Sequence, residues 1–226
     1  MDRMAKALWS AAWLACATCA SAAPFQNGSF EVGGPACFTF NIPAGTTFTP
    51  GWVVSIGNID WDGPPPCSVV ASNGTHSLDL VGTGGIGGVR QTFDTVPGTT
   101  YQVSFDLAGN PGAPPAIKPL TVTVAGTTHD YTFDITGHDA TNMGWTTQTF
   151  TFVATASSET IDFVSDVTAA GGTLNAGATL DNVRVAPLGA GTASLVPVPL
   201  SWAQWAAALL LALGGAWVIG RRRRAG

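Results

Sequence analysis

Apolar and polar residues alternate with a period of two through most of the chain between Phe25 and Val185. In "YQVSFDLAG" (101–109), Tyr, Val, Phe and Leu alternate with Gln, Ser, Asp and Ala. The same alternation occurs in "LTVTVAG" (120–126), "DYTFDI" (130–135), "TQTFTFVAT" (147–155) and "TIDFVSD" (160–166). This pattern, rich in β-branched and aromatic residues, predicts strands that bury one face, and no helical period competes with it.

Glycine- and proline-bearing segments separate these runs, for example "PGT" (97–99), "GNPGAPP" (109–115) and "TGHD" (136–139). Such segments are typical of turns. About ten short strands, each with one apolar face, can bury that face by packing two sheets together. The sequence therefore predicts an all-β domain over residues 23–186, an antiparallel two-sheet sandwich of jelly-roll type.

The beginning of the sequence differs in composition from this domain. Arg3 and Lys6 precede an apolar run at residues 7–19, and "ASA" (20–22) offers small residues for cleavage. These features predict a signal peptide at residues 1–22, and therefore an exported protein that uses the cell's export machinery.

The end of the sequence is apolar and then basic. Residues 187–201 are small and proline-bearing, which predicts a flexible spacer. Residues 203–220 are apolar apart from Gln204, and as a helix they would span roughly 27 Å, enough for a bilayer core. We therefore expect a transmembrane helix at residues 202–226, with the domain outside and four cytoplasmic arginines, Arg221, Arg222, Arg223 and Arg224.

The predicted domain is strongly acidic. Between residues 23 and 196 it has 13 acidic residues and three basic ones, Arg90, Lys118 and Arg184. Such a surface repels phosphate backbones, so we expect no nucleic-acid partner. It suits extracellular solubility, neutral polysaccharide or cations.

Two of the four cysteines fall in the predicted signal peptide, which leaves Cys37 and Cys67 in the domain. A cysteine pair in an exported protein predicts a disulfide. This bond would close a loop of roughly 30 residues and stabilise the domain by about 3–4 kcal/mol. Two free buried thiols are the alternative.

The C-terminal stretches "VPVPLSWAQW", "LLLALGGAW" and "RRRR" resemble the bacterial PEP-CTERM sorting signals, and among them the IPTL-CTERM type. Neither Pro-Glu-Pro nor Ile-Pro-Thr-Leu is present. The resemblance implies cleavage near residues 196–201 by an exosortase-like enzyme, with Val196, Pro197, Pro199 and the four arginines as the signal. It also implies an inner-membrane intermediate, followed by the cell surface or extracellular matrix of a Gram-negative bacterium. An ordinary single-span anchor is the alternative.

The domain resembles the choice-of-anchor C family of exported bacterial domains. The residues that carry the resemblance include "NGSFE" (27–31), "GNIDWDG" (57–63), "GTHSLDLVG" (74–82), "VRQTFDTVPGTTYQVSFDLAGNP" (89–111) and "ATLDNVRV" (178–185). The domain is also similar to plant cell-wall proteins and, in outline, to galactose-binding-like carbohydrate modules. The resemblance implies a galactose-binding-like jelly roll but no established activity.

Glu31 and Asp181 lie near the two ends of the domain. The first and last strands of a jelly roll can lie close together, so these carboxylates could converge with backbone carbonyls near Asn27 and Ser29. Such oxygen ligands suit calcium, and the galactose-binding-like modules often carry a structural calcium in that place. A turn cap and a strand-end hydrogen-bond acceptor are the alternative roles.

Trp61, flanked by Asp60 and Asp62, is the candidate ligand-binding set. The segment "NIDWDG" is bounded by glycine and proline and is interpreted as a loop, where binding residues often lie. An indole face can stack on a sugar ring while carboxylates bind its hydroxyl groups. Trp52 and Trp145 are expected to pack in the core or at an edge.

Nothing in the sequence predicts a catalytic site. The three histidines have no metal-ligand spacing, and Asp79, Asp94 and Asp106 are expected to face solvent from strands. No carboxylate pair stands out as that of a glycosidase. The leading interpretation is non-catalytic association with extracellular polysaccharide. The alternatives are a structural surface or matrix protein without a small ligand, and a carbohydrate-active hydrolase.

Overall fold

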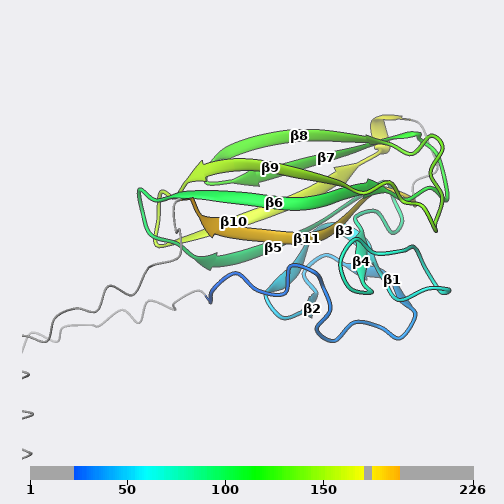
Figure 1. The fold of residues 1–226 in the computed structure, drawn as a ribbon, viewed down its shortest axis with the longest axis horizontal. Coiled ribbons are helices and arrows are strands. Elements are labelled where there is room, and N and C mark those ends of the chain that lie inside the picture. Colours follow the sequence, from blue (N-terminus) through cyan, green and yellow to red (C-terminus); the bar gives the residue numbers. More distant parts are fainter. Residues whose placement is uncertain (1–22, 171–174, 189–226) are drawn as a thin grey trace, which may run out of the picture. The chain divides into compact units, whose positions relative to one another are not determined.

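The computed structural model describes residues 23–170 and 175–188, which form an all-β domain (Figure 1). The described residues contain eleven strands and one short 3-10 helix, η1 (Thr168–Ala170). The strands are β1 Phe38–Pro43, β2 Thr47–Thr49, β3 Trp52–Asp62, β4 Ser77–Asp79, β5 Ile86–Asp94, β6 Thr100–Gly109, β7 Ile117–Val124, β8 Thr127–Asp134, β9 Thr146–Val153, β10 Ser158–Asp166 and β11 Ala178–Pro187. The predicted fold class, an antiparallel sandwich, is confirmed.

The strands form two antiparallel sheets that share one strand. Sheet A has the order β1-β3-β4-β11-β6-β9, and sheet B has the order β2-β3-β5-β10-β7-β8. The long strand β3 passes from sheet B to sheet A at Gly57, which has a φ of 56°. A Cβ there would lie 1.9 Å from the carbonyl oxygen of Ile86, so only glycine allows the two strands to approach this closely.

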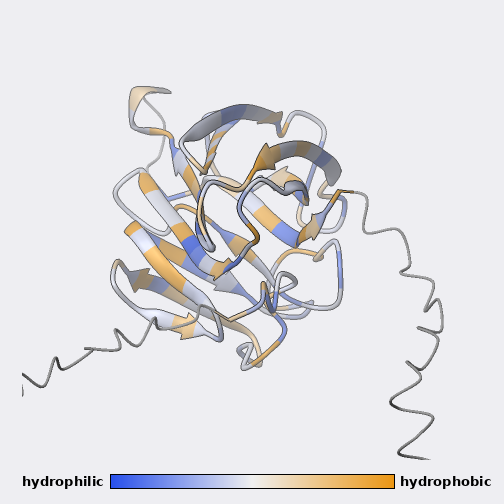
Figure 2. Cartoon of the chain, turned by 90° about the vertical axis from the view of Figure 1, so that its left-hand side faces the viewer, coloured by the Kyte–Doolittle hydropathy of each residue, from blue (hydrophilic) through white to orange (hydrophobic). Residues whose placement is uncertain are grey.

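The alternation in the sequence places one face of each strand in the core, and Figure 2 shows the resulting apolar and polar bands. On β6, the side chains that face the core are those of Tyr101, Val103, Phe105 and Leu107. The ring of Phe105 meets that of Phe163 on β10 edge-on, with the ring centres 5.3 Å apart. Because burying one such side chain stabilises a fold by about 1.5–3 kcal/mol, these contacts hold the two sheets together.

The last strands of the two sheets, β8 and β9, close one side of the sandwich. His129 on β8 stacks on Phe150 on β9, with ring centres 4.1 Å apart. Tyr131, two residues further along β8, meets Phe105 edge-on. Ring contacts therefore link two strands that share no backbone ladder.

The two ends of the sandwich carry different connections (Figure 1). At the tight-turn end, the connections are residues 95–99, 125–126 and 154–157. Both ends of the described chain also lie there, since Asp94 N donates to Ala23 O and Leu188 N donates to Thr100 O. At the loop end, the connections are longer: residues 63–76, 110–116 and 135–145.

Several predictions concern residues outside the described part of the chain. These are the signal peptide at 1–22, the transmembrane segment at 202–226, and the sorting signal with Val196, Pro197, Pro199 and the four arginines. Among the residues that are described, no helix is long and apolar enough to cross a membrane.

Candidate functional site

The outer face of sheet A carries a group of aspartates beneath residues 63–76, which we call the covering loop. Asp181 of β11 lies opposite Asp106 of β6, and Asp60 of β3 lies opposite Asp79 of β4. With Asp62, these five residues have exposed fractions of 9% or less. The prediction that Asp79 and Asp106 face solvent is therefore wrong. They point outward from their strands as the alternation implies, but other parts of the chain cover them.

Three of these carboxylates anchor the covering loop. The hydroxyl groups of Ser68 and Ser72 donate to Asp62 and Asp106, respectively. The backbone N–H of Asn73 donates to Asp181 at 2.7 Å. Hydrogen bonds to a charged acceptor are stronger than neutral ones, so a row of aspartates is a firm support for a loop.

Burial raises the pKa of most aspartates in this group. It raises the pKa of Asp79 and of Asp181 to about 7, and that of Asp62 to about 6. Burial also opposes ionisation of Asp106, but hydrogen bonds from three side chains hold the pKa of this carboxyl below its usual value. The group therefore combines a carboxylate with acids that titrate near neutral pH.

The predicted ligand-binding set does not form a surface site. Residues 58–62 belong to strand β3 and not to a loop. Trp61 is 4% exposed, and its ring meets Phe48 edge-on within the core. Asp62 binds the covering loop, while Asp60 accepts a hydrogen bond from Asn41 N at 2.7 Å. This burial removes Trp61 from any surface that a sugar ring could reach.

The two ends of the domain do meet, because Val183 N donates to Gly28 O at 2.8 Å. Glu31 nevertheless binds the covering loop: it accepts from His76 N at 2.9 Å and pairs with His76 Nδ1 at 2.7 Å. Burial opposes ionisation of Glu31, but its hydrogen bonds, led by that with His76, hold its pKa below the usual value. Asp181 binds the same loop at Asn73, two residues before Thr75, whose N–H also donates to Glu31.

Calcium at Glu31 and Asp181 stays a prediction. Their oxygens accept N–H groups of the covering loop and of Asn182, so a cation would have to replace these donors. Within residues 23–170 and 175–188, no group of three or more His, Cys, Asp or Glu is placed to hold a metal ion.

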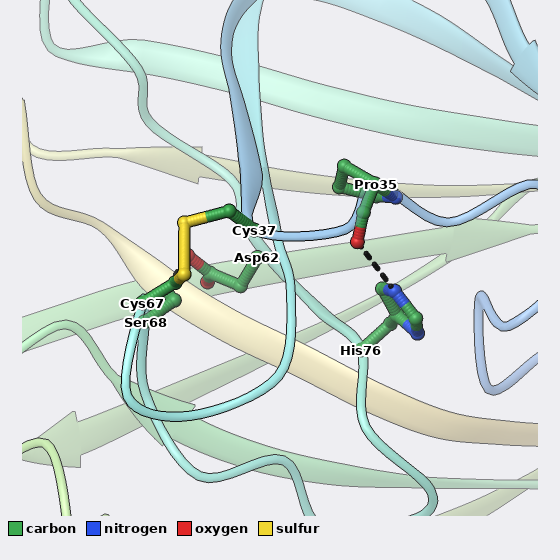
Figure 3. The surroundings of a disulfide bond; sticks show 6 residues. All are labelled: Pro35, Cys37, Asp62, Cys67, Ser68 and His76. Atoms are coloured by element: carbon green, nitrogen blue, oxygen red, sulfur yellow. Dashed lines mark hydrogen bonds between the residues drawn. A yellow bond between two sulfur atoms is a disulfide. The ribbon is translucent and has the colours of Figure 1, made fainter.

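The predicted disulfide is confirmed. Cys37, just before β1, is bonded to Cys67 in the covering loop, with a Cα–Cα distance of 5.2 Å (Figure 3). Ser68 follows directly and donates to Asp62. Further along the same loop, His76 Nε2 donates to Pro35 O at 3.0 Å. The disulfide and the bond from His76 therefore attach the covering loop at two points to the segment that precedes β1, and Ser68 attaches it to β3.

An open cavity of about 270 Å³ lies at the loop end of the sandwich. Its lining residues come from the covering loop, from residues 110–116 and from residues 135–145: Val69, Asn110, Pro111, Gly112, His138, Asp139 and Ala140. Trp145 supports one wall, because its Nε1 donates to Val70 O at 2.9 Å. Val70 N in turn donates to Ala140 O at 2.9 Å, which joins the covering loop to the β8–β9 loop.

His138 and Asp139 give the cavity an imidazole and a carboxylate. One oxygen of Asp139 accepts three hydrogen bonds from Thr141 and Asn142. These bonds, those of Thr141 first, hold the pKa of Asp139 below its usual value. His138 Nδ1 lies 3.2 Å from Asn142 O and donates to it, while the ring packs on Phe133. Both side chains are thus fixed by their own loop.

Asn110 contributes an amide from the opposite wall. Its Nδ2 donates to Asp79 Oδ2 at 2.6 Å, and its Oδ1 accepts from Gly112 N at 2.8 Å. A side-chain amide has two N–H groups and two lone pairs, so one of each remains for a ligand.

The sequence predicts only turns at the segments that build this cavity. "GNPGAPP" (109–115) follows β6 and "TGHD" (136–139) follows β8, and both strands run toward the same end of the sandwich. One feature of the sequence could have indicated a site: both segments are longer than a two-residue hairpin turn, and both contain polar side chains. Without the strand order, nothing in the sequence places the two turns side by side.

The domain matches one family along almost its entire described length. A family model described as "Protein of unknown function (DUF642)" matches residues 23–186. The chain belongs to the DUF642 family. The match includes the covering loop and all the cavity residues, so the cavity lies within the DUF642 domain. No curated protein matches the sequence.

Solved structures with a similar fold include carbohydrate-binding modules. TmCBM61 in complex with β-1,4-galactotriose is 17% identical, with 74% of this chain and 100% of that chain covered and a TM-score of 0.46. A native family 35 carbohydrate-binding module from Clostridium thermocellum is 13% identical (61% and 92% covered, TM-score 0.41). The CBM22-1 xylan-binding domain of Xyn10C from Paenibacillus barcinonensis is 18% identical (69% and 96% covered, TM-score 0.40). At these identities the likeness concerns the fold, and it assigns no ligand to the DUF642 domain.

Proposed function

We propose that this DUF642 domain binds a neutral carbohydrate, without catalysis, in the cavity at its loop end. The observation that carries the proposal is the composition of that cavity: an amide, an imidazole and a carboxylate line it together with the apolar residues Val69, Pro111 and Ala140. Small-molecule sites generally combine apolar walls with a few convergent polar groups.

The three polar groups suit hydroxyl-rich ligands. Asp139 supplies an acceptor, and Asn110 supplies both a donor and an acceptor. His138 has a second ring nitrogen besides the one that binds Asn142. A cavity of about 270 Å³ lies just below the range of pockets that hold drug-sized ligands, so it suits one sugar unit of a longer chain.

The charge of the site selects against acidic sugars. Asp139 is the one carboxylate among the lining residues, and no arginine or lysine accompanies it there. A uronic acid would place a second negative charge beside it, which is unfavourable near a protein of formal net charge −5. The expected ligand is therefore a neutral glycan.

The arrangement also supports binding without hydrolysis. Glycosidases need two carboxyl groups about 5–9.5 Å apart across the scissile bond, whereas Asp139 has no second carboxylate among the lining residues. The acids whose pKa is raised toward neutral, Asp62, Asp79 and Asp181, accept hydrogen bonds from surrounding backbone and side chains.

A glycan array with neutral, amino and acidic sugars tests the proposal. We expect the mature protein to bind neutral glycans, and His138→Ala and Asp139→Asn each to weaken binding at least about tenfold, or about 1.4 kcal/mol. Asp130→Asn is the matched control, because this exposed aspartate of β8 lies on the outer face of sheet B. Failure to bind any glycan, or unchanged affinity in both cavity variants, would overturn the proposal.

Two further parts of the proposal concern the setting of the domain. We infer export to the cell surface or matrix with removal of the C-terminal segment; intact mass spectrometry of the cell-derived protein would show both cleavage points.

Structural calcium at Glu31 and Asp181 should raise the unfolding temperature, and Asp181→Ala should abolish that shift. An unchanged midpoint in a chelator would rule calcium out.

A further inference from the structure

Two buried charged side chains lie behind the cavity and take no part in lining it. Asp79 of β4 is 1% exposed, and Lys118 of β7 is 0% exposed. Charged groups are rarely buried so completely unless partners compensate them. Both side chains have hydrogen-bond partners, and for each of them one partner lies in residues 110–116, which we call the cavity loop.

Asp79 accepts hydrogen bonds from three different segments. Its Oδ1 accepts from Val81 N at 2.9 Å and from Gly177 N at 3.0 Å. Its Oδ2 accepts from Nδ2 of Asn110, a cavity residue, at 2.6 Å. All three partners are donors, so the ionised carboxylate is the form that matches this environment.

Lys118 binds the same segments from the other side. Its Nζ donates to Ala113 O at 2.7 Å and to Ala176 O at 2.8 Å. A third bond, from Asn110 N to Gly177 O at 3.0 Å, links the two segments directly. The cavity loop is therefore held at Asn110 and at Ala113, on either side of Pro111 and Gly112.

We propose that Asp79 and Lys118 are positioning residues of the cavity, and that ionisation of Asp79 orders the cavity loop and thereby strengthens glycan binding. The binding part rests on the proposed function, whereas the ordering of the loop does not. Protonation of Asp79 turns an acceptor into a hydroxyl group that faces the Asn110 amide, so one of its three bonds is lost. The wall that carries Asn110 then loosens.

The groups that face Asp79 set the pH at which this happens. Burial is the largest influence and, with the nearby Asp62, raises the pKa of Asp79 to about 7, against the effect of its hydrogen bonds. Asp60 lies directly opposite on β3, and the Lys118 ammonium acts in the other direction. Loop order should therefore increase as the pH rises from 6 to 8.

Global stability should change in the opposite direction over the same pH range. A carboxyl whose pKa is raised by folding binds more protons in the folded than in the unfolded chain, so its ionisation destabilises the fold as the pH rises. If Asp79 and Lys118 only stabilised the fold, affinity and unfolding temperature would fall together. Opposite trends therefore distinguish a positioning role from a purely structural one.

Hydrogen exchange on the ligand-free mature protein gives the decisive test. We expect protection factors at Asn110, Gly112 and Gly177 to rise about tenfold from pH 6 to pH 8 in the wild type. Asp79→Asn should show low protection at both pH values, because its amide N–H group faces a donor. Lys118→Met should also lower protection at Asn110 and Gly112. Asp162→Asn, a half-buried aspartate of sheet B, is the control and should behave as the wild type.

Titration of the neutral glycan that the array selects gives the second readout. Wild-type affinity should rise about tenfold over the same pH range while the unfolding temperature falls, and Asp79→Asn should abolish the rise. His138→Gln should bind more weakly but keep the pH dependence. Wild-type protection and pH dependence in Asp79→Asn would overturn the inference. If the array selects no glycan, the proposed function fails, and the exchange experiment still decides the role of Asp79.

Discussion

At the tight-turn end of the sandwich, backbone groups of neighbouring turns bind one another, whereas at the loop end side chains from the strands and from the segment before β1 hold the covering loop. Gly98 N donates to Ala154 O at 2.8 Å, and Ala154 N donates to Thr99 O at 3.0 Å. At the loop end, by contrast, Asn73 N is bound by Asp181 and His76 N by Glu31.

The difference follows from the length of the connections. A turn of two to five residues can satisfy its polar backbone groups locally, but a loop of fourteen residues lying on a sheet cannot. Aspartates on the outer face of sheet A supply the missing acceptors. The aspartates of the domain thus satisfy the backbone N–H groups of its long covering loop. Loops held on a rigid sheet in this way can form a binding cavity.

Removing the disulfide should have the largest effect, and it should act at the loop end. Replacing both Cys37 and Cys67 with serine frees a segment with a sequence separation of 30. We expect the free energy of unfolding in urea to fall by about 3–4 kcal/mol. Hydrogen exchange should show the covering loop opening first. Equal loss of protection at residues 95–99 would contradict the distinction between the ends.

Raising the pH should have the next largest effect, which is to lower the free energy of global unfolding. The folded protein keeps Asp79 and Asp181 protonated up to about pH 7 and Asp62 up to about pH 6, whereas the unfolded chain ionises them near pH 4. The stability that these three groups contribute is therefore fully present near pH 4 and is lost as the pH rises through 7, by on the order of several kcal/mol between pH 5 and pH 8.

Denaturant melts across this pH range would measure the loss. Glu31 and Asp106, whose pKa values are lowered, act in the opposite sense but only below about pH 4. A stability that rises from pH 5 to pH 8 would therefore show that the raised pKa values are not those of the folded protein.

A pair of matched substitutions compares one carboxylate anchor at each end. Asp181→Ala removes the acceptor of Asn73 N, and we expect a loss of about 2 kcal/mol, since a hydrogen bond to a charged group contributes about 1.5–3 kcal/mol. Glu159→Ala at the tight-turn end removes an acceptor of Thr155 N and Ala156 N. Glu159→Ala should lower the free energy of unfolding by only about 1 kcal/mol, because the N–H groups of a short turn can reorient and bind water. A larger loss for Glu159→Ala would reverse the comparison.

The smallest effect on stability is expected when a single methyl group is removed at the tight-turn end. Ala125 and Gly126 have φ angles of 49° and 73°, as a type I′ hairpin turn requires. Ala125→Gly removes the steric cost of a left-handed alanine, about 1–2 kcal/mol, but adds the backbone entropy of glycine, about 0.5–1 kcal/mol. Thermal unfolding should therefore shift upward slightly, by the equivalent of about 0.5 kcal/mol. A downward shift would mean that the turn is not strained.

The sequence predicts the strands well because alternation reports directly on burial. The runs at residues 101–109 and 160–166 correspond closely to β6 (Thr100–Gly109) and β10 (Ser158–Asp166). Two cysteines in the predicted domain, together with the expectation of export, were also sufficient to predict the disulfide. These predictions depend on local pattern and composition, which the sequence displays.

The candidate site was not predictable in the same way. Period two places Asp79 and Asp106 on the outer face. It does not show that the covering loop, which ends three residues before Asp79 and thirty residues before Asp106, lies over that face. The "NIDWDG" segment is a strand because β1 and β4 pair with it on both sides, which overrides its turn-like composition. Asn110 and His138 come together only through the strand order, which no local pattern encodes.

The position of the chain ends has a mechanical consequence. A glycan held at the loop end and a pull transmitted through Leu188 would stretch the domain along its length. The load would enter β11, which pairs with β6 from Ala178↔Gly109 to Pro187↔Tyr101. Because the ladder hydrogen bonds run perpendicular to the strands, such a force shears them together and does not peel them apart one by one. The ladder therefore resists tension that is applied between the cavity and Leu188.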